Sequence, residues 1–379
     1  YAGGLLISQI FGWSLFQAMI IVARIAASFT TMGGLKAVVS TGVFQSVIII
    51  LTSIILTILA LKKIGGIEEL VRETPASHWK LFRPATDPEY SWIAIILGYP
   101  VVAVYYWCTD QTIVQKVLAA KNIKEGQYGA VFVSALKIIM PFIFIFPGIM
   151  CFVLFKDIAR PDNAYMTMVK HLMPHGLLGL SVSALIAALM DTVSSGLNSF
   201  TSVFTLDVVN RNKKLNEKQI RHTGRLVTVL AAAVSLFIAM LFSWSGKGFF
   251  DLTQGLASIL APPLSVVFLA GVLWKRANNT AAEFVLFGGG LLCAVLGVCH
   301  ILNFPYKGFW PHFLLLSFYT FLALAVLMII VSLVTKPVYG QPLPSVAETN
   351  RRFKHNSKSV WVFWAILALI MLLIYILFN

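Results

Sequence analysis

The feature that most constrains this chain is a series of apolar stretches, each about 20 residues long, separated by short polar segments. A helix rises about 1.5 Å per residue, so such a stretch crosses the roughly 30 Å of hydrocarbon in a bilayer. A transmembrane barrel would instead show segments of about ten alternating residues, and the sequence contains none. The pattern therefore predicts an all-α, polytopic membrane helical bundle.

Composition agrees with this class and excludes others. Hydrophobic residues make up 58% of the chain and charged residues 12%, whereas soluble domains are about a quarter charged. The net charge of +14 comes from basic residues between the spans rather than along one polar face, so we expect no nucleic-acid partner. The four cysteines lie in or beside apolar runs without metal-ligand spacing, which predicts neither disulfides nor a zinc site. The connecting segments are too short for a catalytic domain, so we expect no enzyme.

Ten spans are expected after a short apolar lead-in from Leu5 to Phe11. We expect prolines to interrupt two of them, at Pro141 and Pro147 in the fourth span and at Pro262-Pro263 in the seventh. The ten spans are placed at residues 13–32, 38–60, 92–109, 127–155, 176–208, 223–244, 250–274, 280–302, 312–335 and 359–378.

Basic residues in the connecting segments predict the orientation, because cytoplasmic loops carry the excess of lysine and arginine. The connection from Lys62 to Tyr90 balances five basic with five acidic residues and is expected to face outward. We therefore predict a multi-pass protein of the plasma membrane or cell inner membrane. The expected inner segments carry Lys36, then Lys116, Lys121 and Lys124, the run from Arg211 to Arg225, Lys275-Arg276, and finally Arg351, Arg352, Lys354 and Lys358.

Four charged residues lie within apolar spans: Arg24, Lys137, Asp191 and Asp251. A charge at membrane depth is costly and usually faces the bundle interior or a water-filled cavity, so each is a functional candidate. Lys137 lies about ten residues into its span, too deep to reach the near interface easily. It is either one half of a buried ion pair between helices or a hydrogen-bond donor in a polar cavity.

Asp191 stands in a run of oxygen-bearing residues, Met190 to Ser195, in the middle of an apolar span. Carboxylate, hydroxyl and carbonyl oxygens suit a small hard cation such as sodium. Ser194 or Ser195 shares a helix face with Asp191, so several oxygens are able to converge. Serine and threonine also pack membrane helices together, which is the alternative. For Asp191-Thr192 we favour cation binding.

Two further segments combine aromatic and polar residues. Tyr105 to Gln111 ends a span, where aromatic residues form an interfacial belt or, beside a polar cavity, offer a face to a sugar ring. Phe249 to Gln254 opens a later span. Asp251 is explained equally well as an ordinary helix-start acid, favoured by the helix dipole. Gln254 lies one turn deeper and is a stronger candidate for contact with a solute.

Several separated motifs occur in a fixed order: Tyr106-Trp107-Cys108-Thr109-Asp110-Gln111 with Ile113-Val114-Gln115, Leu118-Ala119-Ala120-Lys121-Asn122, Lys137 before Pro141, Asn198-Ser199 with Phe204-Thr205-Leu206-Asp207, Phe250-Asp251 with Gln254, and Pro262-Pro263 ahead of Trp274-Lys275-Arg276. Together they resemble the sodium/solute symporter family, and specifically its sodium/glucose cotransporter branch. The resemblance is close from the first residues to about Arg276 and follows the hydrophobic pattern beyond.

The resemblance implies a leucine-transporter-type fold, in which two inverted five-helix repeats hold substrate and sodium near the bilayer midplane at interrupted helices. Relatives in this branch have more than ten spans, so the ten seen here look like the last ten. On this basis residues 1–379 form a single membrane transporter domain that is N-terminally incomplete. Residues 1–61 would end the first repeat, residues 92–274 would form the second, and residues 280–379 would be peripheral C-terminal helices.

The same resemblance implies roles in binding the solute. Lys137 and Gln254 correspond to donors to sugar hydroxyls, Tyr106 to an inner gate over the sugar, and Trp107 to its neighbour in the sugar site. Phe250 and Asp251 look like outer-vestibule residues. Ala103 replaces a polar sugar contact of relatives, which leaves room for a hydroxylated substrate other than glucose.

It also implies a sodium site. Ala188, Asp191 and Thr192 fall where the family places a backbone carbonyl and two serine hydroxyls around sodium. Asp191 replaces the first serine, and its carboxylate would bind sodium more strongly, take a proton instead, or pair with Arg24. The run Ser40-Thr41-Gly42-Val43 lacks the acidic residue that relatives place there, so one charge is missing.

These inferences predict a secondary active symporter that couples sodium influx to uptake of a sugar such as glucose or galactose. Its partners would be sodium, the sugar or polyol, and the lipid bilayer. The alternatives are a sodium-coupled transporter of inositol, another polyol or a carboxylate, and a non-accumulating solute sensor or channel of the same fold. A purely structural membrane subunit is disfavoured by the polar residues at membrane depth. The sequence sets no oligomeric state.

Overall fold

The computed structural model of the chain describes residues 1–87, 90–156, 158, 161–211, 214–244, 248–302, 304–306, 308–335 and 358–378, without the side chains of residues 32–41 and 358. Within these ranges every regular element is helical. The basic residues predicted to be cytoplasmic at Arg351, Arg352 and Lys354 lie outside the described residues, as do the side chains of Lys36 and Lys358.

By length and composition, nine helical segments in the described ranges are able to cross a membrane, or up to ten if one bent pair counts as a span. The bent pair joins Ala2–Phe11 to Leu15–Thr31 at an angle of 119°. The expected ten spans equal the upper of these two counts. The nine segments are Gly42–Ile64, Trp92–Thr109, Ile123–Leu154, His175–Asn210, Glu217–Ser243, Phe249–Leu273, Asn279–Leu302, Phe313–Val334 and Ser359–Leu377.

The first helices differ from the prediction. The expected lead-in is itself helix α1 (Ala2–Phe11), which ends at Gly12 in a left-handed conformation with φ 70° that glycine adopts without strain. The spans predicted at 13–32 and 38–60 are parts of one helix, α2 (Leu15–Ile64). The connection expected between these two spans is therefore helical rather than a loop.

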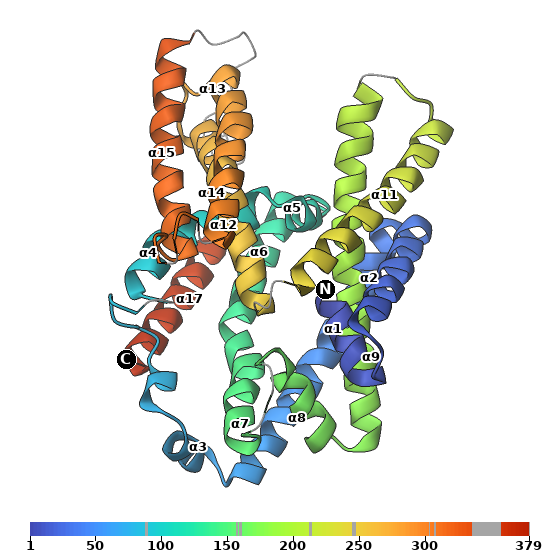
Figure 1. Ribbon diagram of the computed structural model, residues 1–379, viewed down its shortest axis with the longest axis vertical. Helices are drawn as coiled ribbons and strands as arrows, with labels where there is room; N and C mark the ends of the chain where they lie inside the picture. Colours follow the sequence, from blue (N-terminus) through green and yellow to red (C-terminus); the bar gives the residue numbers. More distant parts are fainter. Residues whose placement is uncertain are drawn as a thin grey trace. The chain divides into compact units, whose positions relative to one another are not determined.

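By backbone contacts the chain divides into two compact units. Unit 1 comprises Tyr1–Trp79 and Ala135–Phe249. Unit 2 comprises Lys80–Ser134 and Phe250–Asn379. Figure 1 labels their principal helices.

The remaining α-helices are α3 (Ile67–Glu73), α4 (Trp92–Val104), α5 (Gln111–Leu118), α6 (Ile123–Met140), α7 (Phe146–Leu154), α8 (Ala164–Leu172), α9 (His175–Val203), α11 (Glu217–Ser243), α12 (Phe249–Leu273), α13 (Asn279–Glu283), α14 (Gly290–Leu302), α15 (Phe313–Val334) and α17 (Lys358–Leu377), with short 3-10 turns η1 (Ala76–Trp79) and η4 (Pro161–Asn163).

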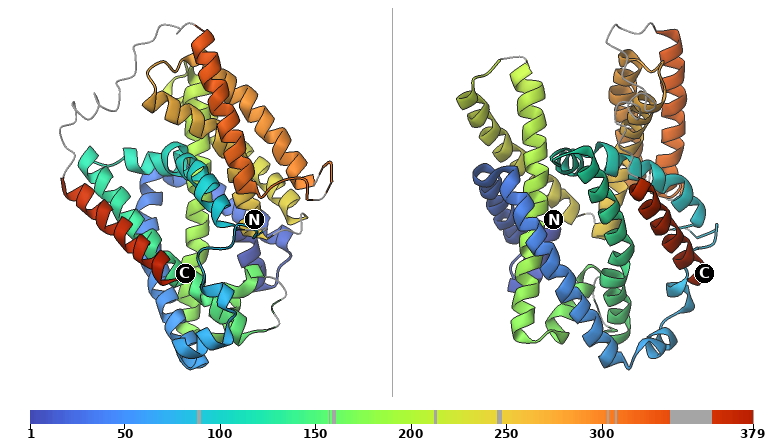
Figure 2. Two further views of the ribbon diagram at one scale, coloured as in Figure 1. Left: turned by 90° about the vertical axis from the view of Figure 1, so that its left-hand side faces the viewer. Right: turned by 180° about the vertical axis from the view of Figure 1, so that it is seen from behind.

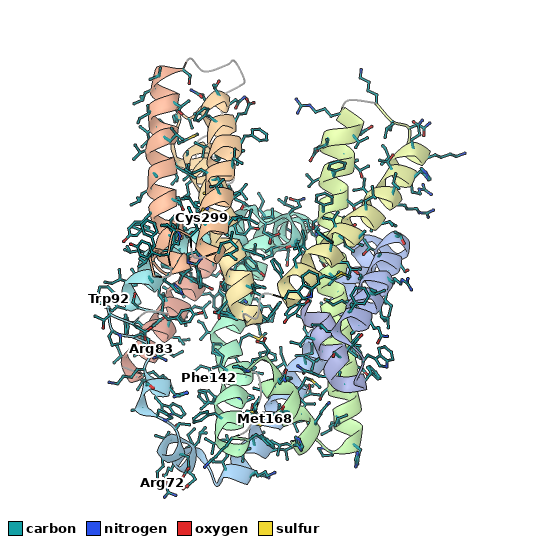
Figure 3. The ribbon with its side chains drawn as sticks, in the orientation of Figure 1. Arg72, Arg83, Trp92, Phe142, Met168 and Cys299 are labelled. Atoms are coloured by element: carbon teal, nitrogen blue, oxygen red, sulfur yellow. The ribbon has the colours of Figure 1, made fainter. Side chains whose placement is uncertain are left out.

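In unit 1, helix α9 packs along α2 and α11, as the views in Figure 2 also show. Helices α7 and α8 pack against the second half of α2, around a core that includes Leu56, Met150 and Met168. Met168 lies on α8 beside α2 and α7 (Figure 3). A hydrogen bond of 2.6 Å between the hydroxyls of Ser53 and Tyr165 joins α2 to α8. The sequence did not predict α8, which is a nine-residue helix with mixed polarity.

In unit 2, helix α15 packs on α4 and on α13. One core cluster gathers Val101 and Val102 of α4 with Ala261 of α12 and Leu314 of α15. The Ser265 hydroxyl donates a hydrogen bond of 2.8 Å to the Val101 carbonyl and ties α12 to α4. This polar contact is fully buried, so it adds a directional constraint to the apolar packing.

Four π-helical segments widen the spans locally: η2 (Tyr105–Thr109), η3 (Pro141–Ile145), η5 (Phe204–Asn210) and η6 (Phe284–Gly289). Pro141 begins η3, so the expected irregularity there is a widened turn within a span that continues. The interruption predicted at Pro262-Pro263 is wrong, because α12 continues through both prolines. Both prolines are buried, so packing offsets the loss of their backbone donors.

Candidate functional site

The polar segment of α9 lies at the middle of a membrane-length helix. Asp191 and Thr192 come three and four residues after Ala188, and Ser195 comes four and three residues after them, which places the four residues on one side of the helix. The helix is regular from His175 to Val203, so the three residues predicted to bind sodium are brought together. Thr192 is exposed, Asp191 is half-buried and Ser195 is buried, so this side of the helix is accessible to an ion at Thr192.

Two of these groups are directly hydrogen-bonded. The Thr192 hydroxyl donates to the Ala188 carbonyl at 2.9 Å. The Thr192 oxygen keeps lone pairs that this bond does not use, whereas the Ala188 carbonyl also accepts the backbone amide of Thr192 in the regular helix, so both of its lone pairs are engaged. The hydroxyl of Thr192 is therefore able to ligate a cation beside the carboxylate of Asp191, and the Ala188 carbonyl would do so in place of its bond from that hydroxyl.

Helix α2 covers another side of this polar segment. The buried Ser194 hydroxyl donates a long hydrogen bond of 3.4 Å to the Ala26 carbonyl of α2. The Asp191 carboxylate faces Gly42, where an added Cβ would lie 3.3 Å from Oδ2. The Ser195 hydroxyl is also buried and has no hydrogen-bond partner in the described part of the chain. Sequence reasoning gave Gly42 no positive role, because nothing in the sequence places it against Asp191.

Arg24 was one possible partner of Asp191, and its geometry argues against that pairing. Its side chain is exposed on α2. Among the described side chains the ion pairs are Arg72 with Glu69 and Arg83 with Asp87, and none joins Arg24 to Asp191. The Asp191 carboxylate is therefore not neutralised by that arginine.

The predicted solute-binding residues are divided between the two units. Lys137 belongs to α6 within unit 1, one turn before η3, and its side chain is exposed. Gln254, in α12 of unit 2, is partly buried. The exposed ammonium of Lys137 and the amide of Gln254 are both hydrogen-bond donors that suit the hydroxyls of a sugar or polyol.

Tyr106 and Trp107 form an aromatic pair in the widened segment η2. Their ring centroids lie 5.6 Å apart at an interplanar angle of 81°. The side chains are 44% and 42% exposed, so part of each ring is accessible to a ligand. The segment is fixed at its end because Asp110 accepts a 2.8 Å hydrogen bond from the Thr112 amide and caps α5. Widened turns of this kind occur often at functional sites.

Phe250 and Asp251 belong to a second cluster, at the start of α12. The Tyr90 hydroxyl donates a 3.2 Å hydrogen bond to Asp251. The Tyr90 ring lies 6.4 Å from that of Phe250 and 5.2 Å from that of His312. The cluster thus links the starts of three spans in unit 2. Sequence reasoning missed Tyr90 and His312, whose only signal is a position next to an apolar span.

Burial shifts the titration of His312, the residue that caps α15. Burial lowers its pKa below the ordinary value of 6.5, and His300 lowers it further, whereas Asp251 and Asp87 act in the opposite direction. Its side chain accepts a hydrogen bond from the Leu314 amide, which requires an unprotonated ring nitrogen.

We therefore expect acid to destabilise the protein through His312. A lowered pKa in the folded state contributes stability that is present above pH 6.5 and is lost as the pH falls through the folded-state value. His312→Asn keeps a capping side chain without the titration. Thermal unfolding at pH 7.5 and 5.5 should show a smaller acid-induced drop in Tm for the variant than for the wild type. Equal drops would contradict this assignment.

Comparison with known proteins gives the following likenesses. Residues 1–289 match the family model described as sodium:solute symporter family. The sodium/mannose cotransporter of Bos taurus is 33% identical over 327 residues, which are 76% of this chain and 54% of that protein. Sodium/glucose cotransporter 1 of Ovis aries is 29% identical over 393 residues, 89% of this chain and 59% of that one. Sodium/myo-inositol cotransporter 2 of Homo sapiens is 33% identical over 328 residues, 77% and 49% of the two chains. The chain thus spans about half the length of the curated relatives it matches.

A solved structure shares the fold. It is the substrate-bound outward-open state of a Na⁺-coupled sialic acid symporter, with a TM-score of 0.73 and 22% sequence identity. The likeness covers 89% of this chain and 71% of the other. The expected leucine-transporter-type helical fold is therefore confirmed.

Proposed function

The chain belongs to the sodium:solute symporter family, and from this premise we propose that it couples sodium influx to the uptake of a sugar such as glucose or galactose. It is a multi-pass membrane protein of the plasma membrane or cell inner membrane. The relatives it matches are transporters, and we propose transport rather than catalysis for this chain as well.

One observation carries the proposal: three oxygen-bearing groups lie within about one turn of α9, in the middle of a membrane-length helix. Ala188 offers a carbonyl, Asp191 a carboxylate and Thr192 a hydroxyl, and two of these groups are already in contact. Such hard oxygens suit sodium, and a charge at this depth persists where it has a function. We propose that these three residues bind the coupling ion.

For the solute we propose Lys137 and Gln254 as hydrogen-bond donors to hydroxyls, with Tyr106 and Trp107 presenting aromatic faces to the ring. Phe250 and Asp251 would line the outer vestibule, where Tyr90 holds the Asp251 carboxylate in place. We further propose that residues 1–61 end the first inverted repeat, that residues 92–274 form the second, and that residues 280–379 are peripheral helices of one transporter domain.

The energetics suit accumulation of the solute. One sodium ion moving inward gains about 2.3 kcal/mol per 100 mV of membrane potential. Since each 1.4 kcal/mol is a factor of about ten, a single ion is able to drive accumulation of tens-fold. Coupling is reciprocal, so sodium raises the affinity for the solute only as far as the solute raises the affinity for sodium.

Myo-inositol is a second candidate solute, because two of the similar relatives are sodium/myo-inositol cotransporters, at 30% and 33% identity. The same donors and aromatic faces suit its ring of hydroxyls. A direct comparison of sugar and inositol therefore belongs in the test of function.

The test is uptake into vesicles that contain the protein as it occurs in its own cell. An inward sodium gradient should drive uptake of labelled glucose, mannose or myo-inositol, with an inward current evoked by the preferred solute. Choline in place of sodium should abolish both signals. Solute binding without sodium-dependent uptake would contradict symport and favour a solute sensor or channel.

Lys137→Ala and Gln254→Ala should weaken the apparent affinity for solute more than that for sodium. Loss of a hydrogen bond costs about 1 kcal/mol, and about 1.5–3 kcal/mol when one partner is charged. We expect about a fivefold loss for Gln254 and at least about a tenfold loss for Lys137. Lys116→Ala, at an exposed lysine of α5, is the matched control. Measured half-saturation concentrations for both substrates decide the outcome, and an equal loss for sodium would contradict these roles.

A further inference from the structure

Gly42 of α2 lies against the carboxylate of Asp191. A Cβ built on Gly42 would meet three atoms of Asp191 first, Oδ2 at 3.3 Å, Cγ at 3.8 Å and Oδ1 at 3.9 Å. The nearest neighbours are thus the whole carboxyl group rather than the backbone of α9. This distinguishes Gly42 from a glycine that only lets two helices approach, such as Gly98, whose added Cβ would meet a carbonyl at 2.2 Å.

We infer that Gly42 is a positioning residue, whose missing side chain admits the Asp191 carboxylate to the contact between α2 and α9. This inference rests on the proposed role of Asp191 in binding sodium. An added Cβ at Gly42 would already require the carboxylate to shift by a few tenths of an ångström, and a larger, branched side chain would also compete for the space beside Oδ2. Because aspartate has only two side-chain torsions, this displacement changes the position of both oxygens.

The polar groups around the Asp191 carboxylate, at the contact between α2 and α9, suit a bound cation. Ser194 and Ser195 are buried next to Asp191 on α9, and the Ser195 hydroxyl has no hydrogen-bond partner among the described residues. The Ala26 carbonyl of α2 accepts from Ser194 at 3.4 Å. The carboxylate therefore stands at a contact that also contains hydroxyl and carbonyl oxygens, all of which stabilise a cation.

The same geometry makes positions 42 and 191 interchangeable as the source of the charge. The Cβ of an aspartate at position 42 would lie 3.3 Å from the present position of Asp191 Oδ2, within reach of the same contact. With serine at position 191, a carboxylate from α2 would have room in the same contact. With acids at both positions, two like charges would lie close together, and the pKa of one of them would rise.

The test is an exchange of the acid between the two helices. Sodium dependence is measured by uptake and by sodium-induced change in Tm, at constant ionic strength with choline as the replacement cation. The variants are Asp191→Ser, Gly42→Asp, the double exchange Gly42→Asp/Asp191→Ser, and Gly42→Val in both the wild-type and the Asp191→Ser backgrounds. Gly196→Val is the control, because an added Cβ at Gly196 of α9 meets nothing within 4 Å.

We expect Asp191→Ser to raise the half-saturation concentration for sodium about tenfold or more, and the double exchange to recover most of that loss. Gly42→Val should raise it in the wild type and leave it unchanged in the Asp191→Ser background, whereas Gly196→Val should have little effect. If Gly42→Val does not fold, the exchange pair decides alone.

Two results would overturn the inference. One is a double exchange that is no more sodium-dependent than Asp191→Ser. The other is a Gly42→Val effect of equal size in both backgrounds, which would make Gly42 a packing residue only. A wild-type protein without any response to sodium would instead refute the proposed function itself, so the two failures are told apart by the wild type.

Discussion

Replacing Asp191 with alanine is expected to lower the affinity for sodium at least about tenfold, because it removes the one carboxylate from the proposed cation site. The fold should tolerate the change. A charged side chain at membrane depth is costly to bury, so alanine should leave the Tm without sodium unchanged or raise it. Asp191→Asn keeps the size of the side chain and removes the charge, and should reproduce the loss. Titration of sodium against uptake and against Tm measures both effects.

The matched control for this prediction is Glu283→Ala, which removes an exposed acid where α13 enters a span of unit 2. It should leave the sodium dependence unchanged. If Asp191→Ala has the same sodium dependence as the wild type, Asp191 is not a sodium ligand. Uptake that needs an inward proton gradient instead of sodium, and that Asp191→Asn abolishes, would assign the carboxylate to a proton.

The long apolar helices could be predicted from the sequence because each carries its own boundary signals. The third expected span at 92–109 agrees with the helical segment Trp92–Thr109, since Ser91 caps its first helix, α4, and Asp110 caps α5, the helix that follows. Helix α8 has no such signal, as it owes its place to packing on α2 and to the bond between Tyr165 and Ser53. The continuity of α2 was also missed, because a polar, glycine-containing stretch resembles a loop on a hydropathy pattern.

The sequence predicted only those parts of the candidate site whose residues are close together in the chain. Ala188, Asp191 and Thr192 share a helix face by spacing alone, and the structure adds the hydrogen bond between two of them. From the sequence, Asp191 is an acid where relatives have serine, and the run that contains Gly42 lacks the acid that relatives have there. Nothing in the sequence connects these two differences. Positions 42 and 191 are distant in the chain, so only the packing of α2 on α9 brings them together. The contacts of Tyr90 with Asp251 and His312 were hidden for the same reason.

Gly98→Ala is the substitution expected to damage folding most. Gly98 of α4 lies against α15, and an added Cβ would stand 2.2 Å from the carbonyl oxygen and 2.6 Å from the carbonyl carbon of Leu314. No rotamer change moves a backbone carbonyl, so the two helices would have to separate through the buried cluster of Val101, Val102 and Ala261. Overpacking of this kind costs about 1–3 kcal/mol or more. We expect a lower Tm and a lower yield of folded protein.

Two comparisons separate this backbone clash from a general intolerance of alanine. An added Cβ at Gly271 of α12 meets nothing within 4 Å, so Gly271→Ala should leave Tm unchanged or raise it slightly. At Gly289 the Cβ would meet the Leu324 side chain at 2.7 Å, so the cost of Gly289→Ala should fall in a Leu324→Ala background. The cost of Gly98→Ala should persist in a Leu314→Ala background, because the carbonyl is still there. Relief by Leu314→Ala would show that the two helices meet through side chains at this point and would refute the prediction.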